Sequence, residues 1–339
     1  MQQIKALEKS VIWVPLIILI FVASSALIRF VTSPTPPGAQ IAAKQQKLDS
    51  AQDKMFRSIF ESGSKSFQDG QYTQALEQYA EAGKVVPQLR EDEYTALKNA
   101  RQQIAEIYEN GARRAEAETL YKGMIESAFR DAAAQLKASD LEAALERYQD
   151  AAKLADHLSD AQKVYRISAT KGEIATLRRM NRFPDALQAS QHLIDYLQAS
   201  DQGDPDIVQA YMSMGETYQI QRDWAHLEAT LPTSIAICDR ILQQNSGVPT
   251  NRDPVWKVTA SEDQILYALM EAYDHDGKPD QALATAQTLY DFIAKYSTQW
   301  LELGPHGRKD VAKYAFLIAT RAGRPDAAST WQARINEAH

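Results

Sequence analysis

Three short segments of the chain carry residue types that could do chemistry. The first is Ser62-Gly63-Ser64-Lys65, which has the serine–lysine spacing of acylating enzymes of the S-x-x-K type. Such enzymes also need Ser-Asp-Asn and Lys-Thr-Gly motifs on a sheet-containing fold, and neither motif occurs in this sequence. We therefore interpret Gly63 as a residue that lets two helices pack closely.

The other two segments are Asp274-His275-Asp276 and the single cysteine, Cys238. Adjacent residues on a helix point in different directions, so the Asp-His-Asp run is not expected to converge on a metal ion. Cys238 lies on an apolar helical face, where a lone thiol behaves as a small hydrophobic residue. Phosphate-binding glycine loops and the common hydrolase motifs are also missing from the sequence. We predict no catalytic, cofactor or metal site, and no enzyme.

Charge and composition narrow the class of protein further. The 339 residues carry a formal net charge of −7, which argues against a general nucleic-acid binder, because such a protein needs a basic face. The apolar fraction of 45% and the charged fraction of 24% are typical of globular proteins. Nothing in the sequence indicates a small-molecule substrate.

The N-terminal region predicts a membrane anchor. Val11 to Ile28 is a run of eighteen uncharged residues, which as a helix spans about 27 Å, close to the hydrocarbon thickness of a bilayer. We predict a short tail (1–10), a single transmembrane helix (11–31) and an extended proline-rich spacer (32–40), followed by a helical domain (41–339). A cleaved signal peptide is the alternative, because small residues at 23–26 offer a cleavage site. The flanking charges are nearly even and do not set the orientation, so the cytoplasmic side stays open. Because short N-terminal tails commonly stay in the cytoplasm, we expect an extracytoplasmic (periplasmic) domain.

After the spacer, the residue pattern predicts helices only. Residues 56–87 form two amphipathic segments joined at Gln68-Asp69-Gly70-Gln71. The first segment contains Gly63, and the second carries a stripe of Ala75, Tyr79 and Ala82. One such hairpin cannot bury its own apolar face, so the pattern indicates a stack of hairpins.

This segment closely resembles a tetratricopeptide (TPR) repeat, a helix-turn-helix unit of 34 residues with small residues at its packing points. The matching residues are Ile59, Gly63, Ala75, Tyr79, Ala82 and Pro87. Ser62 and Ser66 stand where the family has a leucine and a tyrosine. The resemblance implies an all-α fold, a TPR-like α-solenoid that forms a right-handed superhelix of helical hairpins.

The resemblance recurs along most of residues 41–339, in five to seven units. The small residues Ala117 and Ala144 are only 27 positions apart, so two units there should share residues, either as one long helix from about 116 to 136 or as a broken short one. We expect a turn at Asn181-Arg182-Phe183-Pro184, an interruption at Pro232 and a longer break at 245–261. Gly215 belongs to the fifth unit, in which Leu227 and Leu231 replace the usual alanine and tyrosine.

In a TPR-like solenoid, the first helix of each pair lines the concave face, which binds proteins or peptides. By helical register we predict a protein-binding face that is basic in the middle and acidic at its flanks, with exposed aromatic anchors. Its candidate residues are Phe60, Phe67, Lys171, Arg178, Arg179, Met212, Glu216, Gln219, Tyr267 and Glu271. The expected function is a membrane-anchored scaffold that recruits protein partners. The alternatives are an extracytoplasmic holdase and an accessory factor for envelope or secretion enzymes.

Overall fold

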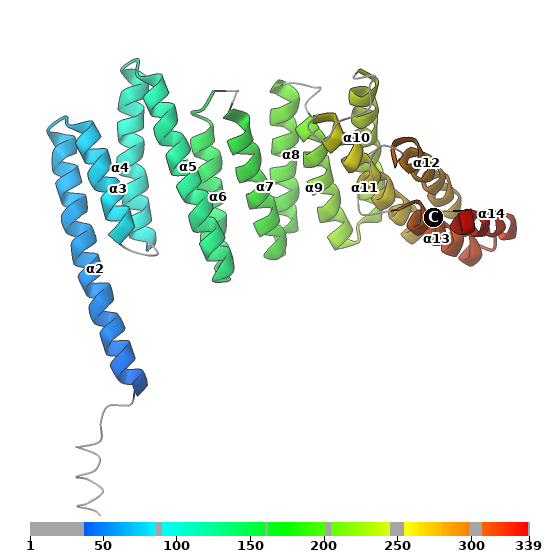
Figure 1. Cartoon of the computed structure of the whole chain (residues 1–339), viewed down its shortest axis with the longest axis horizontal. Coiled ribbons are helices and arrows are strands. Elements are labelled where there is room, and N and C mark those ends of the chain that lie inside the picture. The colour runs from blue at the N-terminus through cyan, green and yellow to red at the C-terminus, as the bar shows by residue number, and fades with distance from the viewer. Residues whose placement is uncertain are drawn as a thin grey trace, which may run out of the picture. The chain divides into compact units, whose positions relative to one another are not determined.

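The computed structural model describes residues 37–85, 90–159, 162–200, 205–244, 254–297 and 307–337. These residues form thirteen α-helices, α2 to α14, and no strand is found among them (Figure 1). The predicted tail (1–10) and transmembrane segment (11–31) lie outside the described residues. Within the described ranges, no helix is at once long enough and apolar enough to span a bilayer.

The chain divides into two compact units, Met1–Ala100 and Arg101–His339. The first contains α2 (Pro37–Gln68), α3 (Tyr72–Val85) and the beginning of α4 (Glu91–Asn110). The predicted extended spacer is wrong over its last four residues, because α2 begins at Pro37. Proline is favoured at the first helical position, where its fixed φ suits the helix and its missing N–H has no partner to lose. Residues 32–36 lie outside the described residues.

The α2/α3 hairpin packs as the glycine and alanine pattern predicts. A Cβ on Gly63 would lie 2.7 Å from the ring of Tyr79, so only glycine allows this approach. Tyr79 is buried, and the ring of Phe60 lies 5.2 Å from it between centroids. Phe60 and Phe67 are both half-buried, and the ring of Phe67 lies 5.7 Å from that of Tyr72 between centroids. The prediction of exposed anchors at Phe60 and Phe67 is therefore wrong, because aromatic residues of α3 and of α2 itself cover them.

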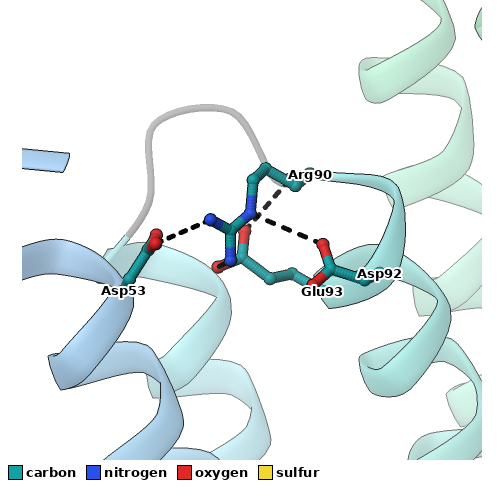
Figure 2. A network of polar contacts seen from close by, with 4 residues as sticks. All are labelled: Asp53, Arg90, Asp92 and Glu93. Atoms are coloured by element: carbon teal, nitrogen blue, oxygen red, sulfur yellow. Dashed lines mark hydrogen bonds and ion pairs between the residues drawn. The ribbon is translucent and has the colours of Figure 1, made fainter. Parts of the chain in front are cut away.

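A charged network fixes the start of α4 against α2 (Figure 2). The guanidinium of Arg90 donates to Asp53 at 2.6 Å and to Glu93 at 3.1 Å, and it lies 3.4 Å from Asp92. The backbone N–H of Arg90 also donates to Glu93, at 3.0 Å. Glu93 is only 3% exposed, so these bonds compensate for the removal of its carboxylate from water. These acceptors raise the pKa of Arg90, with the hydrogen bond that it donates to Asp53 as the largest cause.

The second unit is a stack of antiparallel hairpins. Its helices after α4 are α5 (Arg114–Lys137), α6 (Leu141–Ala155), α7 (Lys163–Arg179), α8 (Phe183–Ser200), α9 (Pro205–Gln221), α10 (Trp224–Gln244), α11 (Pro254–His275), α12 (Pro279–Ser297), α13 (Arg308–Arg321) and α14 (Pro325–Glu337). Each helix packs on the next, and α7 also touches α5 and α9, while α9 touches α11. The odd-numbered helices α5 to α13 therefore form one layer, which we call the odd-helix layer, and the even-numbered helices α6 to α14 form the other.

The long helix expected at about 116–136 is confirmed as α5. It is the second helix of the α4/α5 hairpin and the first helix of the α5/α6 hairpin. It buries residues along its whole length, from Ala117 and Tyr121 to Ala132 and Gln135. The hydroxyl of Tyr121 donates to Glu109 of α4 at 3.4 Å, and its ring stacks on His157, just after α6, at 4.4 Å. One helix thus supplies packing surface to both neighbours.

Seven described hairpin turns share one backbone conformation. Each has a single residue with φ between 57° and 74°, namely Gly70, Ala112, Ser139, Asn181, Arg222, Gly277 and Gly323. The following N–H closes the helix end by bonding to a carbonyl five residues back, as in Lys278 N–H to Tyr273 O at 2.8 Å. The predicted turn at 181–184 is confirmed. The shared conformation gives seven hairpins, with α5 counted in two of them.

Replacing Ala112 by glycine should stabilise the protein. Alanine at φ 60° holds its Cβ close to the following carbonyl, and glycine removes that strain. After the extra entropy of glycine in the unfolded chain, we expect a gain of about 0.5–1 kcal/mol in the free energy of unfolding. Denaturant unfolding of the full chain measures it, with Gly277→Ala as the opposite change. A loss of stability in Ala112→Gly would contradict the assignment of the turn.

Two expected irregularities are wrong. Helix α10 continues through Pro232, although proline removes the N–H that would bond to the carbonyl of Glu228. Leu231 and Ser234 on either side are buried, and this packing holds the helix together. The break predicted at 245–261 is also too long, because α11 begins at Pro254, again a proline at the first helical position. Residues 245–253 lie outside the described residues.

Candidate protein-binding groove

A groove of about 400 Å³ in the second unit is lined by residues of α9, α10 and α11. Residues on successive turns of α9 and α11 form its walls. The lining residues are Met212, Gly215, Glu216 and Gln219 of α9, Leu227 and Leu231 of α10, and Gln264, Ile265, Tyr267, Ala268 and Glu271 of α11. The groove therefore combines an apolar floor with polar side chains at its rim.

The floor exists because Leu231 replaces a tyrosine. In the α2/α3 hairpin, Tyr79 lies sixteen residues after Gly63 and covers it. In the α9/α10 hairpin, Leu231 lies sixteen residues after Gly215, and a Cβ on that glycine would meet Leu231 at 3.0 Å and Leu227 at 3.2 Å. The two leucines therefore cover Gly215, and because a leucine is smaller than a tyrosine, it fills less of the space between the helices. The departure from the repeat pattern coincides with the groove.

A ladder of polar pairs crosses the odd-helix layer. Arg178 of α7 pairs with Glu216 of α9, and Gln219 of α9 donates to Glu271 of α11 at 3.0 Å. The next step joins α11 to α13, where Asp274 accepts from Tyr314 at 2.9 Å and from Arg321 at 2.6 Å. Arg178 of the predicted basic middle and Glu216 of a predicted acidic flank therefore pair with each other across the boundary between two hairpins.

The structure brings half of the predicted binding residues together. Met212, Glu216, Gln219, Tyr267 and Glu271 all line the groove, and Arg178 reaches its edge through Glu216. The remaining residues of the second unit, Lys171 and Arg179, lie on α7 outside the lining, half-buried and exposed respectively. Phe60 and Phe67 belong to the first unit. Whether these residues bind a partner stays a prediction.

Burial and charge shift the ionisation of the α11 side chains. The half-buried position of Glu271 raises the pKa of its carboxyl, and Asp274 adds to this, while His275 and the bond from Gln219 oppose it. Burial also raises the pKa of Tyr267, with further contributions from Glu271 and Asp310. Both tyrosines of this face, Tyr267 and Tyr314, stack at 5.9 Å between ring centroids and remain neutral phenols near neutral pH.

The other segments with possible chemistry have structural partners. In Asp274-His275-Asp276, Asp274 bonds to α13, His275 stacks on Trp224 at 4.5 Å, and Asp276 pairs with Lys278 at 2.6 Å. The three side chains diverge, and no group of metal-ligating residues is found among the described residues. Cys238 is fully buried in the apolar core, and this burial raises the pKa of its thiol.

Six lining residues were not among the predicted binding residues, namely Gly215, Leu227, Leu231, Gln264, Ile265 and Ala268. Leu227 and Leu231 were recognised only as departures from the repeat pattern, and Ile265 and Ala268 were not singled out. The useful signal was present in the sequence, since a glycine of the first helix faces two leucines of the second in place of alanine and tyrosine. Such a substitution at the repeat's largest packing position indicates free volume.

Comparisons with known proteins find similarity of fold alone. No protein-family model and no curated protein matches the chain. Among solved structures, the chain is similar to the apo form of RapI, with a TM-score of 0.41, 13% identity, and coverage of 84% of this chain and 97% of that chain. A Rap protein complexed with Competence and Sporulation Factor has a TM-score of 0.40, 9% identity, and coverage of 84% and 76%. The TPR-like repeats of a putative kinesin light chain from Podosopora anserina have a TM-score of 0.36, 12% identity, and coverage of 70% and 93%.

These likenesses are low in score and in identity. The assignment of the fold therefore rests on the packed hairpins and their shared turns, and the described part of the chain is a TPR-like helical-repeat protein.

Proposed function

We propose that the protein is a protein-binding scaffold that holds a segment of a partner protein in the groove between α9 and α11. The observation that carries this proposal is the groove itself, which has a volume in the range of ligand sites and an apolar floor with polar groups at the rim. An extended peptide or one face of a helix suits such a site, because its apolar side chains fill the floor while its polar groups meet the rim.

The proposal includes attachment to a membrane through residues 11–31, with the helical domain on the extracytoplasmic side. The uncharged run from Val11 to Ile28 supports it. A C-terminal fusion to alkaline phosphatase, compared with a fusion to green fluorescent protein, reports the side. Fluorescence without phosphatase activity would overturn the orientation, and release of the full-length fusion into the soluble fraction would overturn the anchor.

Site-specific crosslinking in cells tests the groove directly. A photo-crosslinking amino acid is introduced at Gln264, an exposed residue of the groove rim, in the full-length chain. We expect one or a few crosslinked proteins of discrete mass, identified by mass spectrometry. The groove-filling variant Ala268→Trp should abolish these adducts, because an indole would occupy the space of the partner side chain.

The matched control is Ala284→Trp, which adds the same side chain at an exposed position of α12 in the even-numbered layer. It should leave the adducts intact. Equal loss in both variants, or adducts that persist in Ala268→Trp, would contradict the proposed site. A continuous smear of many clients would favour a holdase instead of a scaffold.

A further inference from the structure

Glu271 differs from Glu216 and Asp274, the other two carboxylates of the polar ladder, in having no lysine or arginine partner among the described residues. Glu216 pairs with Arg178, and Asp274 pairs with Arg321 at 2.6 Å. Glu271 accepts one hydrogen bond from the neutral amide of Gln219, and among the described residues no lysine or arginine pairs with it. It is half-buried and lines the groove, so its carboxylate is held where a cation from outside could reach it.

The side chains next to Glu271 could contact both the charged end and the aliphatic stem of a lysine or arginine from a partner. Tyr267 lies one helical turn earlier on α11 and also lines the groove, and stacking on Tyr314 holds its ring. A guanidinium or ammonium group binds favourably over such a ring. The floor of Leu227, Leu231 and Ile265 matches the aliphatic stem of lysine or arginine, which packs on apolar surface while its charged end stays polar.

The charge of the groove disfavours anionic ligands. Its lining contains two carboxylates, Glu216 and Glu271, and no lysine or arginine. The nearest positive group in the ladder, Arg178, is already paired with Glu216. An acidic peptide or an anionic lipid headgroup would therefore meet repulsion without a compensating partner.

We propose that the groove recognises a partner segment through one arginine or lysine, whose cation pairs with Glu271 and lies over Tyr267 while its stem fills the apolar floor. This inference rests on the proposed function and specifies the chemistry of the bound segment. It also predicts linkage to protons. Burial raises the pKa of Glu271, and a bound cation would lower it again, so binding should tighten as the pH rises through the pKa of the free carboxyl.

Selection of random twelve-residue peptides on the purified full chain tests the inference. Peptides whose binding is lost in Ala268→Trp and kept in Ala284→Trp are taken as groove ligands. We expect each to contain an essential arginine or lysine, whose replacement by citrulline or glutamine weakens binding about 10–100-fold, as for other charge-assisted contacts. Glu271→Gln should weaken binding by a similar factor.

A charge swap separates recognition from a structural role of Glu271. Glu271→Lys should reject the basic peptide and accept its arginine-to-glutamate counterpart, whereas Glu77→Lys, the same change on the exposed surface of α3, should alter neither. Groove ligands without a basic residue, or full binding by Glu271→Gln, would overturn the inference and leave the proposed function standing. Failure to select any peptide that Ala268→Trp displaces would overturn both.

Discussion

Replacing Glu262 by glutamine and Asp263 by asparagine should raise the free energy of unfolding at pH 8 and remove most of its dependence on pH. Both residues lie in α11 and are almost fully buried, at 4% and 1% exposure. Among the residues that the structure describes, Oε2 of Glu262 and both carboxyl oxygens of Asp263 have no hydrogen-bond partner. Burying a charge without partners is costly, and the amide variants carry no charge.

The direction in which stability changes with pH follows from the two pKa shifts. Burial, helped by Asp239 and opposed by Lys295, raises the pKa of Glu262 from 4.5 to about 8, and burial raises that of Asp263 from 3.8 to about 7. Between pH 4 and pH 8 the unfolded chain therefore loses protons that the folded chain keeps. Stability falls as the pH rises through this window, by on the order of a few kcal/mol for each group.

Hydrogen exchange of the α11 amides at pH 5 and pH 8, corrected for intrinsic rates, measures the local free energy of opening. The wild type should be less protected at pH 8, and the double variant should be equally protected at both. The control pair is Glu337→Gln with Asp326→Asn, two exposed carboxylates of α14. Wild-type protection that is unchanged or higher at pH 8 would contradict the prediction.

Adding one methyl group at Gly172 should destabilise the second unit by a net loss of up to about 2 kcal/mol, because overpacking usually costs about 1–3 kcal/mol. A Cβ at this position of α7 would lie 2.3, 2.4 and 2.7 Å from three ring carbons of Tyr148 in α6. The ring would have to leave its place between α6 and α7. The expected loss outweighs the gain of about 1 kcal/mol that alanine brings to a helix interior relative to glycine.

A second glycine provides the control for this prediction. Gly123 of α5 is helical and exposed, and a Cβ there would meet nothing within 4 Å. Gly123→Ala should therefore stabilise the protein, so the two changes have opposite signs in denaturant unfolding. Gly172→Ala combined with Tyr148→Leu should recover part of the loss. Equal effects of the two glycine variants would show that the contact with Tyr148 is unimportant.

The repeat pattern was sufficient to predict the hairpins, because turn residues and small packing residues act locally. The spacing of Ala117 and Ala144 indicated that two hairpins share residues, and the structure decides for one long helix, α5, over a broken short one. Helical register also placed Met212, Glu216 and Gln219 on one face of α9, and Tyr267 and Glu271 on one face of α11. Helical register does not determine how far one hairpin is shifted along the next. The Arg178–Glu216 pair and the Gly172–Tyr148 contact, which join successive hairpins, were therefore not foreseen.

The remaining errors have one physical origin, which is that prolines and aromatic residues were judged from their own segment. Pro254 starts a helix, and Pro232 lies within one because buried neighbours hold it. Phe60 has the register of an exposed position but is covered by Tyr79. The buried Glu262 and Asp263 were not foreseen either, because they directly follow the predicted break at 245–261, whereas α11 begins at Pro254 and contains both in its interior.

The double role of α5 limits how this array can change in length. In an ordinary helical-repeat protein, recombination can delete or duplicate a whole hairpin, because each hairpin has two helices of its own. A cut on either side of α5 instead leaves one hairpin without its second helix or the next without its first. Whole hairpins can therefore be gained or lost before α4 or after α6, while α4, α5 and α6 have to be inherited as one indivisible block.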